Sequence, residues 1–207
     1  WAPEHWEEYA VLDSGDRSRL ERFGTLLLDR PDPSAVWSRS LDFDAWDKAN
    51  ARFEPTGMTK GNWVPLESVP EGWNLKYRSP RLDLTFQLEM TRFKHVGVFP
   101  EQAVNWEFIA EHLKPGDAFL NLFAYTGGAS LAARAAGADV THVDAIRQVV
   151  DWTRIDMELS GLVRNFRFAP YDDALGVGHS GGFTNLLVPG AGEPNYDSMV
   201  ANPFETR

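Results

Sequence analysis

The feature that most constrains the fold is an alternation of short apolar runs with helical patterns in the second part of the chain. Helices are predicted for residues 100–113, 129–136 and 146–159, and buried strands for residues 118–122, 140–144 and 165–168. Short connections between alternating strands and helices favour a parallel sheet with right-handed crossovers. The sequence therefore predicts an α/β domain with a Rossmann-like parallel sheet.

The first part of the chain has a different pattern, rich in Trp and Pro. From Arg81 to Met90 apolar and polar residues alternate, which is typical of a half-buried strand in an antiparallel sheet. Further strands are predicted for residues 9–13, 17–23 and 25–29, a short helix for residues 41–53 and a surface loop for residues 54–72. We expect a small β-rich module at 1–93, followed by the α/β domain at 94–207.

Composition excludes several kinds of chemistry. The 207 residues contain no cysteine, so this chain has no disulfide, thiolate metal site or thiol nucleophile. The five histidines are scattered, and no cluster has metal-ligand spacing, so no metal is expected. The longest apolar runs are too short to span a bilayer, and no signal-peptide pattern opens the chain. A cytoplasmic protein is expected.

The net charge of −10 disfavours tight binding to phosphate backbones. A local basic patch is still possible, because Lys94 and His95 follow Lys76, Arg78 and Arg81 in the sequence. The charge therefore lowers the expectation of nucleic-acid binding without excluding it.

One loop carries the functional argument. The segment Asn121–Gly128 follows the first predicted strand of the α/β domain and opens a helix, which is where open α/β sheets bind nucleotides. Its two adjacent glycines do not form the G-x-G-x-x-G pattern of dinucleotide folds. Asp144 ends the next strand, where an acidic residue can accept hydrogen bonds from both ribose hydroxyls. The structural alternative is a plain turn at Gly127 and Gly128, with Asp144 capping a helix.

Several separated motifs resemble one family. Residues 119–128 and the His142–Ala145 segment are similar to the cofactor site of class I S-adenosylmethionine-dependent methyltransferases. The nearer match is the group related to bacterial large-subunit ribosomal RNA methyltransferases. The resemblance also includes residues 20–24, 28–33 and 93–102, and runs from about residue 9 to about residue 174.

The resemblance implies a cofactor site for S-adenosyl-L-methionine. Its expected residues are Phe99, Gln102, Asn121, Phe123, Ala124, Tyr125, Thr126, Gly127, Gly128, Asp144, Ala145, Asp172 and Asp173. The loop backbone would contact the methionine end, Asp144 the ribose, and Asp172 or Asp173 the adenine amine. A basic residue often follows the glutamine in similar proteins; here it is Ala103, so that position has no assigned role. Asp173 as a helix cap, Gln102 as a solvated helix residue and Lys94 as part of a charged face are the alternatives.

The resemblance ends after Ala174. Residues 176–192 contain six glycines and no good helix pattern. The segment ending in Asn202-Pro203-Phe204 suggests a fourth strand with a degenerate Asp-Pro-Pro motif, whose residues would hold a target amine and stack on a base; a strand end and tail is the alternative. Because similar proteins continue with three further strands, we expect a fragment, a processed chain or a trimmed one. A protein partner or a second copy would cover the exposed sheet edge.

These features predict a methyltransferase that acts on RNA, by resemblance on ribosomal RNA. Methylation at pyrimidine carbon-5 normally needs a cysteine, so direct transfer to a nitrogen or amine is expected. One alternative is a non-catalytic or degenerate cofactor-binding module that pairs with another protein. Another is a methyltransferase for small molecules or proteins, which the acidic charge favours.

Overall fold

The computed structural model describes residues 5–57, 60–170, 174–179 and 182–187. Contacts within the chain divide it into two compact units, Trp1–Val104 and Asn105–Arg207. Residues 94–104 thus lie in the first unit, and the modules predicted at 1–93 and 94–207 stay predictions. Within the described residues, no helix is long and apolar enough to cross a membrane.

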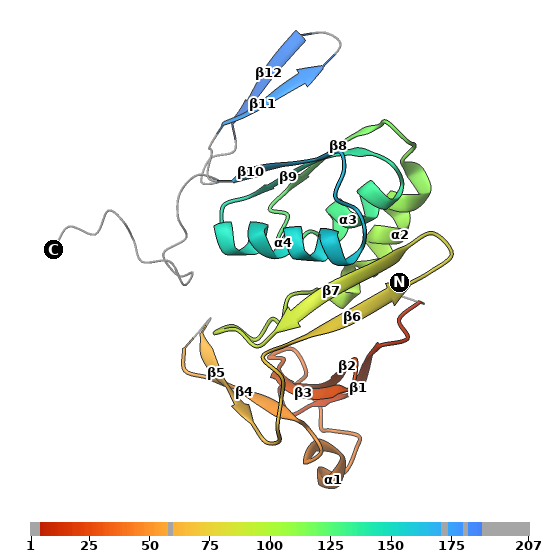
Figure 1. The fold of residues 1–207 in the computed structure, drawn as a ribbon. Helices are drawn as coiled ribbons and strands as arrows, with labels where there is room; N and C mark the ends of the chain where they lie inside the picture. Colours follow the sequence, from red (N-terminus) through yellow and green to blue (C-terminus); the bar gives the residue numbers. More distant parts are fainter. Residues whose placement is uncertain (1–4, 58–59, 171–173, 180–181, 188–207) are drawn as a thin grey trace, which may run out of the picture. The chain divides into compact units, whose positions relative to one another are not determined.

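The first unit is built on a five-stranded sheet with strand order β1-β2-β3-β4-β5 (Figure 1). Its strands are β1 (Tyr9–Gly15), β2 (Ser18–Phe23), β3 (Leu26–Pro31), β4 (Ala51–Pro55) and β5 (Gly61–Pro65). All neighbours are antiparallel except β3 and β4, which are parallel. A parallel pair needs a crossover, and the segment that supplies it contains the one-turn helix α1 (Phe43–Trp46).

A second antiparallel pair completes the strands of this unit. It consists of β6 (Gly72–Arg78) and β7 (Asp83–Glu89). The predicted alternation over residues 81–90 is confirmed, because Leu84, Phe86 and Leu88 are fully buried. After β7 the chain passes through a loop into the single 3-10 turn η1 (Pro100–Gln102).

Two predictions for this unit are wrong. The helix expected over 41–53 is only the four residues of α1, because Ala51 and Phe53 are buried on one face of strand β4. The surface loop expected over 54–72 contains strand β5, which pairs with β4. Several Pro and Gly residues of this segment stand at strand ends. Because such residues are typical of turns, the sequence indicated a loop, and the short edge strand was not predicted.

A carboxylate in β1 accepts several hydrogen bonds from the crossover. Both oxygens of Asp13, which is 8% exposed, accept hydrogen bonds from backbone N–H groups of Ser14, Ser40 and Leu41 at 2.9–3.2 Å. The indole N–H of Trp46 donates to Oδ2 at 3.0 Å. Burial alone would raise the pKa of Asp13, but these donors lower it overall. Asp13 thus contributes to holding α1 and the loop before it, together with the hydrogen bonds between Trp37 and Ser14.

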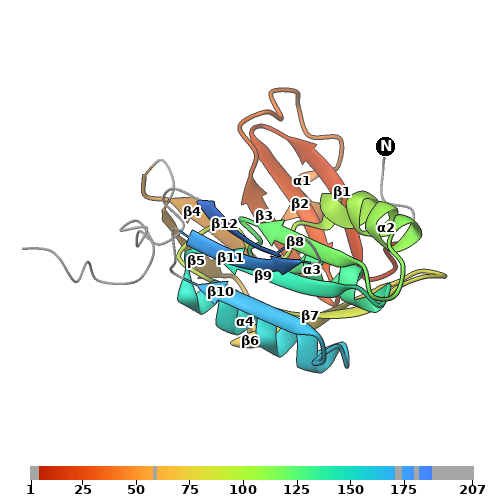
Figure 2. The same cartoon turned by 90° about the horizontal axis from the view of Figure 1, so that it is seen from above.

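The second unit contains a three-stranded parallel sheet with order β10-β9-β8. Its strands are β8 (Ala118–Leu122), β9 (Asp139–Asp144) and β10 (Phe166–Pro170), connected by α3 (Gly128–Ala135) and α4 (Arg147–Leu159). Figure 1 shows both helices against the same face of this sheet, and Figure 2 shows the strands side by side. The predicted βαβ arrangement is confirmed. The burial expected for residues 118–122 is wrong, because β8 has no buried residue and α3 and α4 cover the same face of the sheet.

Helix α2 (Ala103–His112) precedes β8 and contributes to the core of the second unit. Ala133, Ala138 and Val140 are fully buried there, and Ile109, Leu113, Phe119 and Phe166 pack against them. Beyond β10, the backbone forms a separate antiparallel pair, β11 (Ala174–His179) and β12 (Gly182–Leu187). This pair lies in the segment for which the sequence predicted no regular element.

The role of Asp13 predicts a pH-dependent stability. Asp13→Asn removes the charge and leaves one oxygen facing several N–H donors, so we expect a loss of about 1.5–3 kcal/mol in the free energy of unfolding at pH 7. Because the folded-state pKa is lowered, this contribution is present above about pH 4 and is lost as the pH falls through the folded pKa. Urea denaturation at pH 7 and pH 3 measures both effects.

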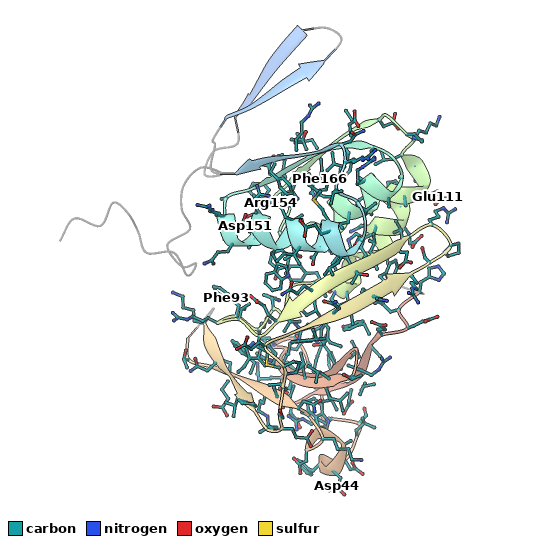
Figure 3. All side chains as sticks on the ribbon, viewed as in Figure 1. Asp44, Phe93, Glu111, Asp151, Arg154 and Phe166 are labelled. Atoms are coloured by element: carbon teal, nitrogen blue, oxygen red, sulfur yellow. The ribbon has the colours of Figure 1, made fainter. Side chains whose placement is uncertain are left out.

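The matched control is Asp44→Asn. Asp44 is an exposed carboxylate on α1, the helix that Asp13 contacts from β1 (Figure 3). Equal stability of the two variants at pH 7 would show that Asp13 does not hold the crossover.

Candidate cofactor site

The candidate site is the loop between β8 and α3, and its backbone is strained. Phe123 and Tyr125 have left-handed φ angles of +54° and +51°. Such conformations cost an L-residue with a bulky side chain roughly 1–2 kcal/mol each. The Phe123 side chain in this loop is 76% exposed. Strained backbone of this kind persists only where neighbouring groups hold it, and it is concentrated at functional sites.

The neighbouring groups hold the loop at two successive residues. The Ala124 N–H donates to the carbonyl of Val143 in β9 at 3.1 Å. The Tyr125 N–H donates to Oδ2 of Asp144 at 2.8 Å, and the Ile146 N–H donates to Oδ1 at 3.0 Å. Asp144 therefore ties the loop after β8 to the turn after β9. Both turns end parallel strands at the same edge of the sheet.

A buried polar chain supports the same loop from behind. Asn121 donates to the hydroxyl of Ser130 at 2.8 Å, and that hydroxyl lies 3.1 Å from Nδ1 of His142. His142 Nε2 lies 3.4 Å from the hydroxyl of Thr153 in α4, which lies 3.1 Å from the carbonyl oxygen of Tyr125. The loop is thus linked to both flanking helices and to β9.

His142 is neutral in this chain. Its side chain is fully buried, and burial lowers its pKa to about 4, with the charge of Arg154 acting in the same direction. Arg154 lies over the ring of Phe168 and pairs with Asp151 on α4 (Figure 3). A neutral imidazole has one donor and one acceptor nitrogen, which suits a chain of hydroxyl groups on both sides.

The two glycines of the loop are required by protein neighbours. Gly127 has a φ of +87°, and a Cβ there would lie 2.4 Å from Cγ2 of Thr153. A Cβ on Gly128 would lie 2.6–2.9 Å from the indole of Trp106 in α2. The structure shows that both glycines let α3 approach α4 and α2. The N-terminus of α3 therefore lies directly after the loop, close to α4 and α2.

The Asp144 carboxylate both holds the loop and keeps the capacity to accept further hydrogen bonds. Burial raises its pKa, and its hydrogen bonds from Ile146 and Tyr125 oppose that shift. Each carboxylate oxygen accepts one backbone bond and keeps a second lone pair. The carboxylate can therefore accept hydroxyl donors from a ligand without releasing the loop.

The structure brings most of the predicted site residues of the second unit together. Asn121, the residues of the loop and Asp144 with Ala145 lie at the carboxyl edge of β8 and β9. Phe99 and Gln102 belong to the other compact unit, on either side of Pro100 and Glu101 in η1. Asp172, Asp173, Asn202, Pro203 and Phe204 lie outside the described residues.

Three residues of the support were missed by sequence reasoning. Ser130, His142 and Thr153 are fully buried and carry the polar chain behind the loop. His142 was noted only as part of a motif. The available signal was a polar residue at positions where α3, α4 and β9 otherwise present apolar or small side chains to the core.

Comparisons with known proteins divide the chain into two resemblances. A solved S-adenosylmethionine-dependent methyltransferase from Agrobacterium tumefaciens is 37% identical, with a TM-score of 0.72 over 81% of this chain and 53% of its own. Ribosomal RNA large subunit methyltransferase K/L from Shewanella amazonensis is 33% identical over 104 residues, which are 49% of this chain and 14% of that protein. The fold is that of class I S-adenosylmethionine-dependent methyltransferases, and the predicted resemblance is confirmed.

The C-terminal segment also resembles a different group of proteins. Residues 155–207 match the BING4CT (NUC141) domain. U3 small nucleolar RNA-associated protein 7 from Saccharomyces cerevisiae is 62% identical over 45 residues, 22% of this chain and 8% of that protein. The chain thus spans about half of the solved methyltransferase and a small part of these other relatives. The matched segment includes Asn202, Pro203 and Phe204, whose roles stay predictions.

The crowding at Gly127 gives a test of the site's construction. Gly127→Ala adds both a left-handed φ penalty and a clash with Thr153, so we expect a loss of about 2–4 kcal/mol in the free energy of unfolding. Gly116→Ala is the matched control, because Gly116 has the same φ of +87° and its Cβ would meet nothing within 4 Å.

The two variants share the backbone penalty, and the difference between them in chemical denaturation measures the packing of the loop against α4. A difference of zero would contradict the close approach of α3 and α4.

Proposed function

We propose that the second unit binds S-adenosyl-L-methionine at the loop Asn121–Gly128. The observation that carries the proposal is the clamp on this loop: a strained turn after β8 is tied by Asp144 to the end of β9. A ligand at that edge would meet the loop backbone and the carboxylate together, at the usual place for a nucleoside in an open α/β sheet.

The proposed roles follow from the groups available. Asp144 would accept the ribose hydroxyls through its free lone pairs, and the backbone of Ala124 to Gly128 would face the methionine end. The absence of a G-x-G-x-x-G turn suits a nucleoside without a pyrophosphate. Phe99 and Gln102 would line the same cofactor pocket, and Asp172 or Asp173 would receive the adenine amine. These last four assignments rest on the family resemblance. The division into modules at 1–93 and 94–207 belongs to the same proposal.

We propose that the reaction is direct methyl transfer to RNA. The methyl group would leave the sulfonium as the acceptor's lone pair attacks in line, and the sulfur would keep the electron pair of the broken bond. Catalysis of this kind depends on positioning and on exclusion of water. The 207 residues contain no cysteine to attack a base, so the acceptor would be a nitrogen or an exposed amine. The relative that carries the RNA assignment is the ribosomal RNA large subunit methyltransferase.

A second candidate function has its own observation. Residues 155–207 match the BING4CT (NUC141) domain, and this is the part where a methyltransferase would continue its sheet. That match favours a non-catalytic module in which a cofactor-binding unit is joined to a segment of different origin. Cofactor binding is common to both candidates, and only methyl transfer separates them.

Cofactor binding is tested by isothermal titration calorimetry with S-adenosylmethionine. Asp144→Ala removes the ribose acceptor and one clamp of the loop, so we expect binding to weaken by about 1–3 kcal/mol, roughly 5- to 150-fold. Asp139→Ala is the control, since Asp139 is an exposed carboxylate at the other end of the same strand. An unchanged affinity in a folded Asp144→Ala chain would remove the ribose assignment, and no binding by the unmodified chain would refute the cofactor.

Methyl transfer is tested with radiolabelled S-adenosylmethionine, using total RNA and protein extract as separate acceptors. Label in RNA is the expected result, and Asp144→Ala should reduce it in parallel with cofactor affinity. Label in protein alone would contradict the acceptor class. Cofactor binding without label in either pool would support the non-catalytic module.

A further inference from the structure

A small cationic cavity lies in the first unit. Its volume is about 40 Å³, and it opens beside the segment that follows β7. The charged or titratable lining residues are Arg19, Arg30, Lys94, His95 and Glu101. Pro31, Val98, Phe99 and Pro100 complete the wall. Three cations thus face a space of one or two water volumes in a chain whose net charge is −10.

Arg30 lines the cavity, and each of its three guanidinium nitrogens donates a hydrogen bond. Its Nε and Nη2 donate to the two oxygens of Glu21 at 2.6 and 2.8 Å, and both side chains are buried. Tyr9 donates to the same carboxylate at 2.7 Å. Burial would raise the pKa of Glu21, but Arg30 and the other donors lower it overall, so Glu21 stays ionised. The remaining Arg30 nitrogen, Nη1, donates to the backbone carbonyl of Lys94 at 3.1 Å.

Lys94 is the cation of the wall that lacks a carboxylate. Its ammonium group donates to the carbonyl of Pro31 at 3.2 Å. Across the described residues no carboxylate lies within ion-pair distance of it, although Glu101 lines the same cavity. Arg19 is partly neutralised, with Nε 3.2 Å from Asp32. A half-buried ammonium with one carbonyl partner retains donors for an anion.

His95 lines the same cavity beside its cations. Burial lowers its pKa to about 4, and the charges of Arg30, Lys94 and Arg19 act in the same direction, while Glu21 opposes them. The net effect of these charges is a positive potential at the imidazole. The ring packs against Phe99 with centroids 4.8 Å apart. A neutral imidazole in that position offers a ring N–H to an anion without adding a charge.

We propose that this cavity binds one phosphate group of the RNA acceptor, with Lys94 and Arg19 as charged donors and His95 as a neutral donor. The size admits phosphate oxygens and is too small for a base. Phosphate contacts supply much of RNA affinity, and an acidic chain must concentrate its cations locally to make them. The identity of the phosphate's carrier rests on the proposed function; the anion site itself does not.

The first test uses inorganic phosphate on the full chain, with the ring C–H resonances of His95 as the NMR readout. At constant ionic strength, phosphate in place of chloride should shift these resonances saturably in the millimolar range. Lys94→Gln should abolish the shift. Lys48→Gln, which removes an exposed lysine of the same unit, should retain it. A non-saturable response in the unmodified chain, or one unchanged in Lys94→Gln, would overturn the site.

The second test uses a single-stranded RNA oligonucleotide at several salt concentrations. Lys94→Gln should weaken binding and reduce the slope of log K against log salt by about 0.7, while Lys48→Gln should change neither. Affinity for S-adenosylmethionine should stay the same in both variants. Lost cofactor affinity with unchanged RNA binding would overturn the RNA phosphate and assign the cavity to the cofactor carboxylate. A saturable phosphate shift in a chain that binds no RNA would instead refute the RNA part of the proposed function.

Discussion

The hydrogen bonds of Asp144 are the interaction on which the candidate site depends. One carboxylate accepts from Tyr125 in the turn after β8 and from Ile146 in the turn after β9, at 2.8 and 3.0 Å. Because these turns end neighbouring parallel strands, the carboxylate fixes the relative position of the two loops that would enclose a ligand. These bonds are part of the support that the strained backbone of Phe123 and Tyr125 needs, together with those that involve Val143 and Thr153. The carboxyl edge of β8 and β9 is thus held in place by hydrogen bonds within the protein itself.

Buried polar groups define the geometry of both units in a similar way. In the second unit, the chain from Ser130 through His142 to Thr153 is built of neutral groups, since burial keeps His142 uncharged. In the first unit, Glu21 and Arg30 keep their charges because they satisfy each other in a bidentate pair. Neutral hydroxyl and imidazole groups position a backbone for ligand binding. Because Glu21 is paired with Arg30, it does not neutralise the neighbouring cation Lys94.

The accuracy of prediction from sequence followed the length and burial of each element. The parallel strands and the helices that connect them were predicted to within about two residues, because short apolar runs alternate with helical patterns over the whole segment. Strand β5 was missed because it begins at Gly61 and ends at Pro65, and both residue types are typical of turns. Trp46 and Ala49 have helical spacing, which led to the prediction of a helix over 41–53. Both are buried around Leu20, but only residues 43–46 are helical, so the prediction was wrong. The site loop was found from its place after β8, whereas its supporting residues were not.

The sequence by itself determined the order of the parallel strands and their helices, the place of the loop after β8 and the acidic residue at the end of β9, because these depend on local pattern and chain order. It also excluded cysteine chemistry by composition. Only the tertiary structure decided why Gly127 and Gly128 are glycines, which donors occupy Asp144, and that Lys94 faces a cavity with Arg19. Each of these depends on atoms brought together from distant segments. Contacts of that kind leave no periodic signal in the chain, since they are set by packing in three dimensions.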